Sequence, residues 1–109
     1  MEVKAERIGT TLVLAPVGHI ETIGAGEFQR YIDEEIASTD EKVILDMAGV
    51  PTVSSAALRG VVLAARRAED RGVTLTICSL TPPVRDVFEM VGFDRLFTVA
   101  DSRHAALNG

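Results

Sequence analysis

Apolar and polar residues alternate along the start of the chain in the manner of β-strands. Residues 2–8 alternate in this way, and a second apolar stretch follows over residues 12–17. Gly9 and Thr10 lie between them, which suits a tight turn joining two antiparallel strands. The pattern therefore predicts an N-terminal hairpin. In its first strand, the residues expected to face the interior are Val3, Ala5 and Ile8.

Two stretches further along the chain have the spacing of amphipathic helices. In the first, apolar residues recur every four positions between charged ones. The second begins at Ser54 and Ser55 and stops before Gly72, a residue suited to end a helix in the left-handed conformation. The apolar face predicted for the first helix consists of Phe28, Ile32 and Ile36.

The last third of the chain repeats the alternation of helix and strand. Thr81 is placed to cap a helix over residues 82–91, which opens with two prolines. Residues 93–99 then predict a short strand. Asp101 or Ser102 is expected to cap a terminal helix.

Two further apolar segments, residues 42–47 and 73–78, predict buried strands. Strands that alternate with helices form parallel sheets joined by right-handed crossovers. We therefore predict one α/β domain spanning residues 1–109. It would hold a mixed sheet of four to five strands, an N-terminal antiparallel hairpin and about four helices, in the order β-β-α-β-α-β-α-β-α.

The net charge narrows the range of partners. With 16 acidic against 11 basic side chains, the chain carries a formal charge of -5 and would be repelled by nucleic acid and by anionic membranes. Its apolar runs fall short of the roughly 20 residues that a membrane-spanning helix needs. Glu2 and Glu6 interrupt the basic N-terminal region, which argues against a secretion signal. We expect no nucleic-acid binding, no membrane insertion and a cytoplasmic location.

The sequence lacks the residue patterns of an enzyme or a metal protein. The serines at 54 and 55 are not part of a GxSxG motif, and His19 and His104 have no recognisable relation to them. Cys78 is the only cysteine and lies in an apolar run, so neither a disulfide nor a metal site is indicated. The glycines around residue 25 lack the rest of a nucleotide-binding motif. We predict no catalytic residue, no metal and no cofactor.

The most informative stretch joins a strand to a helix over residues 43–62. The apolar strand carries Asp46, the chain breaks at glycine and proline, and Ser54 and Ser55 open the helix. Hydroxyls at a helix N-terminus suit a phosphate or partner contact, or they are simply a cap. Asp46 is expected to organise the loop by accepting backbone N–H groups, with a functional acid as the alternative.

At this corner the sequence resembles a STAS domain, specifically the anti-sigma factor antagonists of bacterial partner-switching systems. Members show an apolar strand ending in Asp-Leu, then Asp-Ser-Ser/Thr-Gly-Leu opening a helix. Here the corresponding residues are Leu45-Asp46-Met47 and Ser54-Ser55-Ala56-Ala57-Leu58. The closing run TPPVRDVFEMVGFDRLFTVADSRHAAL is also similar, so the resemblance covers nearly the whole chain.

The resemblance implies regulation by phosphorylation. In that family the serine after the aspartate is phosphorylated by a GHKL-type serine kinase that is also the anti-sigma factor, and a PP2C-type phosphatase removes the phosphate. By position this serine is Ser55, with Ser54 as the alternative. Three positions depart from the motif: Ser54 replaces the aspartate, Ala56 the second Ser/Thr, and Ala57 the glycine.

A phosphate on Ser55 adds about -1.5 to -2 charges at a surface that docks a partner. Together with this charge, the resemblance implies an interaction module that binds the kinase when Ser55 is free and releases it when Ser55 is phosphorylated. The alternative is a STAS adaptor that is never phosphorylated, for example on an ABC transporter ATPase. The residues expected to contact the partner are Ser54, Ser55, Ala56, Arg59, Thr22 and Gly24. Arg59, Arg66 and Arg67 fit either an acidic partner or an ordinary solvated helix face.

Overall fold

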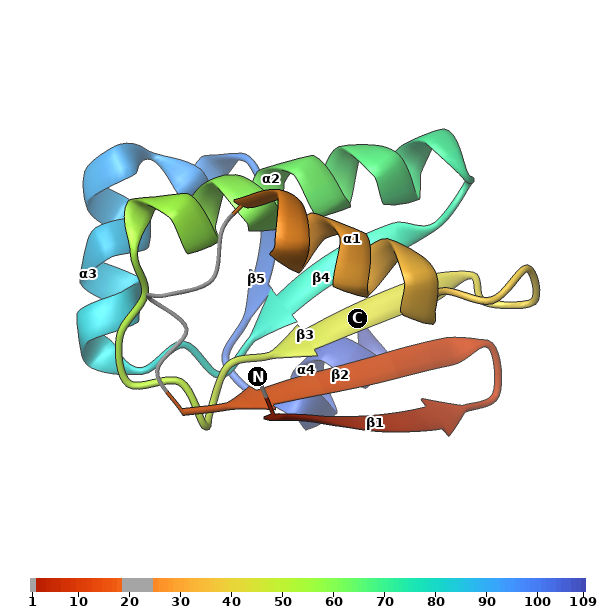
Figure 1. Ribbon diagram of the computed structural model, residues 1–109. Coiled ribbons are helices and arrows are strands. Elements are labelled where there is room, and N and C mark those ends of the chain that lie inside the picture. The colour runs from red at the N-terminus through yellow and green to blue at the C-terminus, as the bar shows by residue number, and fades with distance from the viewer. Residues whose placement is uncertain (1, 19–24) are drawn as a thin grey trace.

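A computed structural model describes residues 2–18 and 25–109 of the chain. Its centre is one mixed sheet of five strands in the order β1-β2-β3-β4-β5 (Figure 1). β1 and β2 form an antiparallel hairpin, while β2, β3, β4 and β5 run parallel to one another. The strands are β1 (Glu2–Ile8), β2 (Thr11–Val17), β3 (Lys42–Asp46), β4 (Thr74–Cys78) and β5 (Thr98–Ala100).

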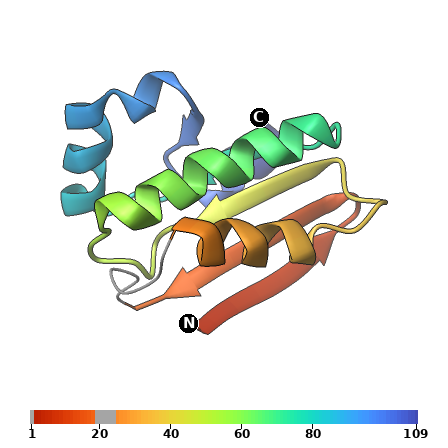
Figure 2. The ribbon, with the colours of Figure 1, turned by 45° about the horizontal axis from the view of Figure 1, so that its top comes forward.

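Helices cover both faces of the sheet, and together they complete the predicted order β-β-α-β-α-β-α-β-α. α1 and α2 lie side by side on one face, α4 lies on the other, and α3 lies beyond the ends of β3 and β4, next to the start of α2 (Figures 1 and 2). A short 3-10 helix, η1, follows α3. The helices are α1 (Ala25–Glu35), α2 (Ser55–Asp70), α3 (Pro82–Val91), η1 (Phe93–Arg95) and α4 (Arg103–Asn108).

The alternation of side chains in the central strands divides the core in two. One face of the sheet packs Leu14 and Leu45 against Phe28 and Ile32 of α1 and Val61 of α2. The opposite face is smaller and packs three strand side chains against α4. Those residues are Val13, Ile44 and Cys78, covered by Ala106.

The predicted ends of α2 are confirmed, and both follow from local chemistry. Ser54 is the N-cap residue, and its hydroxyl oxygen accepts a hydrogen bond from the Ala57 N–H at 3.1 Å. Gly72 has a φ of 75° after the last turn, and the N–H groups of Gly72 and Val73 donate to the carbonyls of Glu69 and Ala68. This is the Schellman arrangement, which favours glycine at that position.

The inward face predicted for β1 is largely wrong. Val3 is half-buried and packs against the main core, but Ala5 is exposed and Ile8 is 44% exposed. β1 is an edge strand that lies beside the area covered by α1 and α2 (Figure 2). An edge strand without a helix over it does not bury alternate residues, whatever its sequence pattern.

The strand predicted over residues 93–99 is much shorter than expected. Phe93 belongs to η1, and only residues 98–100 form β5. The apolar spacing has a different origin, because Phe88, Phe93 and Phe97 form an aromatic cluster with ring centroids 6.0 to 6.5 Å apart. Leu96 does not join this cluster and is 67% exposed.

One predicted cap forms and another does not. Ser102 is the N-cap of α4 and accepts from the Ala105 N–H at 3.1 Å. Thr81 occupies the N-cap position of α3 but makes no side-chain cap bond. The prolines that follow it remove two of the N–H donors at that helix end, and the Thr81 hydroxyl donates instead to the Val50 carbonyl at 2.9 Å.

Candidate functional site

The candidate site is the loop between β3 and α2 together with the first turn of α2. Backbone hydrogen bonds hold this loop against the sheet, since the Met47 N–H donates to the Cys78 carbonyl at 3.0 Å and the Gly18 N–H donates to the Gly49 carbonyl at 2.9 Å. Met47 and Val50 are fully buried beneath it. The loop therefore presents the start of α2 from a fixed position.

The two serines at this corner have different environments. Ser54 is half-buried, and its hydroxyl oxygen is already used by the Ala57 N–H. Ser55 is the first residue of α2 and is exposed, and its hydroxyl makes no hydrogen bond within the described part of the chain. Ser55 thus combines accessibility with the positive end of a 16-residue helix.

Asp46 lies at the end of β3 and is buried. One carboxylate oxygen accepts from the Ala48 N–H at 3.0 Å, and the other accepts from Arg103 Nε at 2.9 Å. Arg103 reaches from α4 and also pairs with Glu6 of β1 at 3.2 Å. The carboxylate therefore joins the beginning of the loop to elements on the other face of the sheet.

Thr81 also contributes to the loop, which sequence reasoning missed. Its hydroxyl bond to Val50 fastens the middle of the loop to the first residues of α3. Arg103 was also missed. Neither residue has a local signal, because their partners lie 31 and 57 positions away in the chain.

The other residues expected at the site are placed as follows. Ala56 is half-buried and Arg59 is exposed on the turn after Ser55. Thr22, Gly24 and His19 lie outside the described residues.

Beside Ser55, α2 forms one wall of an apolar groove with a volume of about 440 Å³. The opposite wall comes from the end of α3 and from η1. The lining residues are Ser55, Leu58, Arg59, Val62, Arg66, Val91, Phe93 and Leu96. The groove was not predicted, because the sequence pattern places Val91 on the apolar face of the helix over residues 82–91 and Leu96 in the strand over residues 93–99.

The two flanks of α2 differ in charge. On the flank facing α1, Arg67 and Arg71 each pair with Asp33 at 3.1 Å. The hydrogen bond from Arg67, together with one from Arg71 to the same carboxylate, lowers the pKa of Asp33 despite the partial burial of its carboxyl. On the groove flank, Arg59 and Arg66 pair with no carboxylate of the described residues. Arg67 is therefore committed within the molecule, whereas Arg59 and Arg66 are not.

Other chemically suggestive groups have ordinary surroundings. His104 is exposed on α4, and burial raises the pKa of the Cys78 thiol, which keeps it protonated. Within residues 2–18 and 25–109, no cluster of His, Cys, Asp and Glu side chains is arranged to hold a metal ion. Over the same residues, no helix has the length and apolar character needed to cross a membrane.

Comparisons with known proteins agree on one family. The STAS domain family model matches residues 2–106. Over 106 residues the chain is 32% identical to BtrV of Bordetella bronchiseptica, described as a candidate anti-sigma factor antagonist; the match covers 97% of this chain and 91% of BtrV.

Solved structures share the fold at lower identity. A crystal structure of a candidate anti-sigma factor antagonist from Thermotoga maritima has a TM-score of 0.86 at 18% identity, covering 97% of this chain and 92% of its own. The anti-sigma factor antagonist SpoIIAA in its unphosphorylated form has a TM-score of 0.78 at 16% identity, covering 98% and 94%.

Proposed function

We propose a phosphorylation switch for this chain, which belongs to the STAS domain family and, within it, to the anti-sigma factor antagonists. As a member of that family it is a regulatory binding module and not an enzyme. In the proposal, the unmodified protein binds an anti-sigma factor that is also a GHKL-type serine kinase. Phosphorylation of Ser55 releases the kinase, and a PP2C-type phosphatase restores binding. The cytoplasm is the compartment in which such a cycle would control transcription.

The observation that carries the proposal is the exposure of Ser55 at the first position of α2. A kinase needs its target hydroxyl to be accessible, and Ser55 meets this requirement. Ser54 does not, because it is half-buried and its oxygen caps the helix. This difference favours Ser55 over Ser54 as the modified residue.

The departure from the family motif at Ser54 is compatible with this choice. Serine and aspartate are about equally effective as N-cap residues, so the exchange preserves the start of the helix. The kinase supplies its own catalytic base and ATP, and phosphoryl transfer to Ser55 does not depend on an acid in the substrate. What the exchange removes is one negative charge that a kinase would meet beside the target serine.

The energies of the two states explain how the switch works. Within the protein, a phosphate at the N-terminus of α2 is favoured by roughly 0.3 to 2 kcal/mol. Against a docked partner that offers no opposite charge, the same phosphate is desolvated, which costs about 3 to 5 kcal/mol for an unpaired charge. The second quantity is larger. Phosphorylation should therefore weaken binding by about a hundredfold or more while the fold remains intact.

Mass spectrometry of the protein after incubation with the anti-sigma factor kinase of its own organism and ATP tests the site. We expect a single phosphate on the wild-type protein and on Ser54→Ala, and none on Ser55→Ala. Phosphorylation of Ser55→Ala at Ser54 would overturn the site assignment. An unmodified wild-type protein that co-purifies with a transporter ATPase would instead support the fixed adaptor.

A further inference from the structure

The groove beside Ser55 extends well beyond the serine. Two smaller hollows, each of about 140 Å³, continue it along α2 and share Leu96 as a common lining residue. On the α2 wall, lining residues run from Ser55 to Glu69, a distance of about 21 Å at the rise of an α-helix. This length is sufficient for about four turns of a second helix.

The groove is lined largely by apolar side chains, and two of those on the side opposite α2 are exposed. Leu96 is 67% exposed and Val91 is 49% exposed, and both line the same hollow as Leu58 and Val62. Exposed apolar side chains that cluster beside a rim of polar residues are typical of interaction surfaces.

In the hollow beside Ser55 the charged lining residues are basic, opposite in sign to the molecule as a whole, and Glu69 lines only the two smaller hollows farther along α2. The chain has a net charge of -5, yet the α2 wall beside the apolar floor carries Arg59 and Arg66. The other arginines of α2 and its C-cap, Arg67 and Arg71, both pair with the carboxylate of Asp33. Arg59 and Arg66 therefore retain their charge for an external carboxylate.

We propose that this groove binds an amphipathic helix of the anti-sigma factor, one that carries apolar residues on one face and Asp or Glu beside them. The apolar face would cover Leu96 and Val91, and the carboxylates would pair with Arg59 and Arg66. The inference rests on the proposed function for the identity of the partner. It adds a second contact region, which reaches along α2 away from Ser55.

The two regions are related through Arg59. Arg59 follows Ser55 by one helical turn, and both side chains line the same hollow. A phosphate on Ser55 would attract Arg59 and repel the acidic helix beside it. Phosphorylation would thus weaken two contacts: the one at Ser55 itself, and the one between the acidic partner helix and the groove.

Charge reversal at Arg66 and polar substitution at Leu96 test the groove directly. The affinity for the purified anti-sigma factor kinase of the same organism is measured by calorimetry for wild type, Arg66→Glu and Leu96→Ser. Each substitution is expected to weaken binding roughly tenfold. Arg66→Lys keeps the charge and should bind within about threefold of wild type.

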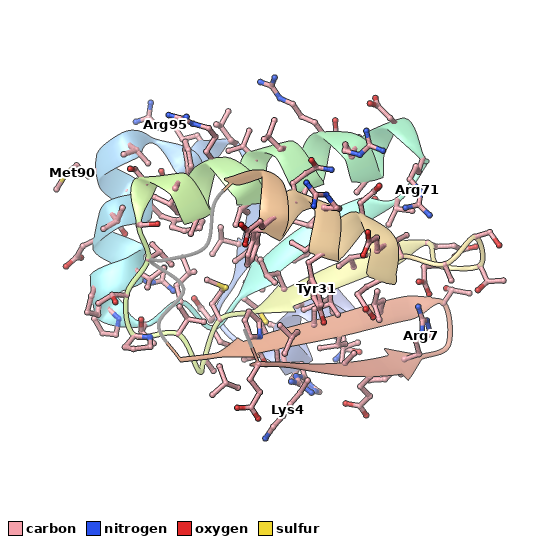
Figure 3. All side chains as sticks on the ribbon, viewed as in Figure 1. Lys4, Arg7, Tyr31, Arg71, Met90 and Arg95 are labelled. Atoms are coloured by element: carbon pink, nitrogen blue, oxygen red, sulfur yellow. The ribbon has the colours of Figure 1, made fainter. Side chains whose placement is uncertain are left out.

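Lys4→Glu is the matched control for the charge change. Lys4 is exposed on β1, on the opposite side of the molecule from Arg95 of η1 (Figure 3). The Lys4→Glu variant should bind the kinase with wild-type affinity. Arg66 and Leu96 are both exposed, so their variants should keep the wild-type thermal midpoint.

The outcomes separate the two proposals. Wild-type affinity in Arg66→Glu and Leu96→Ser, together with weak binding by Ser55→Asp, would overturn the groove inference and leave the phosphorylation switch in place. Weak binding by the groove variants with wild-type affinity in Ser55→Asp would overturn the switch and support the groove. The free protein could also be a dimer that Leu96→Ser converts to a monomer without loss of affinity for the kinase. That result would show that a second copy fills the groove, and it would overturn the inference.

Discussion

Ser54 and Ser55 are adjacent in the chain but differ in what their hydroxyls do. Ser54 stabilises the start of α2 through the bond from Ala57, while the Ser55 hydroxyl stabilises nothing in the described structure. A side chain that contributes little to stability can be modified without unfolding the protein. The division between cap and modification site is therefore the residue-level basis of the proposed switch.

This division predicts unequal effects of two alanine substitutions. Ser54→Ala removes the cap of α2 and should lower the free energy of unfolding by about 1 kcal/mol. Ser55→Ala should change it by less than about 0.5 kcal/mol. Ser54→Asp restores a capping oxygen and should return to wild type. Urea denaturation measures all three, and equal losses for the two alanine variants would contradict the assignment.

Asp40 is a buried carboxylate whose charged form is stabilised by hydrogen bonds. It is buried between α1 and β3, and it accepts hydrogen bonds from Arg7 Nε at 3.2 Å and from the Ala37 N–H at 2.8 Å. Burial acts to raise the pKa of Asp40, but the bonds from Arg7 and Ala37 outweigh it and the pKa is lowered.

The lowered pKa predicts acid sensitivity. Because the folded pKa of Asp40 lies below the unfolded value of about 3.9, its contribution is fully present above that pH and is lost as the pH falls through the folded pKa. Asp33 acts in the same direction. The free energy of unfolding should decline below about pH 4, and Asp40→Asn should reduce that decline while lowering stability at pH 7. An identical pH profile in the variant would refute this account.

Among the secondary-structure elements, the loop before α2 depends on contacts from two distant elements, α3 and α4. Asp46 and Arg103 anchor its beginning, and Thr81 at the start of α3 anchors its middle. These contacts explain how a loop of eight residues between β3 and α2 keeps the serine corner in one orientation.

Removing the Thr81 hydroxyl should loosen this loop. Thr81→Val keeps the shape of the side chain but leaves the buried Val50 carbonyl without its donor, which should cost about 1 to 2 kcal/mol of unfolding free energy. Thr81→Ser retains the donor and serves as the control. Amide hydrogen exchange across residues 47–54 should be faster in Thr81→Val than in the wild-type protein, and it should be unchanged in Thr81→Ser. Unchanged exchange in Thr81→Val would argue against a role for Thr81 in holding the loop.

The elements that the sequence predicted well are those defined by neighbouring residues. Gly72 ends α2 and Ser102 caps α4 through bonds that span three to five positions, so a local pattern contains the necessary information. The errors involve distant neighbours. The exposure of Ile8 depends on β1 being at the sheet edge, and the aromatic cluster around Phe93 depends on how α3 packs.

The same limit applies to the candidate site in the molecule as a whole. The corner that holds Ser54 and Ser55 was identified from the sequence because a strand, a loop and a helix start are consecutive there, and the choice of Ser55 came from the family resemblance. The groove was not, because its walls come from α2 and from the α3–η1 segment, and β4 lies between these in the chain. Only the assembled fold brings Arg66 and Leu96 together.

At the level of the complete protein, the account requires that a new charge change binding and leave folding unchanged. The N-terminus of α2 is expected to tolerate a phosphate, and the core beneath the loop is formed by buried residues that do not include Ser55. Stability and affinity should therefore respond independently to modification.

The most direct test compares the protein before and after stoichiometric phosphorylation of Ser55, with ADP present throughout. Its affinity for the anti-sigma factor kinase is measured by calorimetry, and its thermal midpoint is measured in parallel. We expect affinity to fall by about a hundredfold or more, with the midpoint within a few degrees of the unmodified protein. Equal affinity of the two forms would contradict the switch, and so would a loss of affinity that arises only from unfolding.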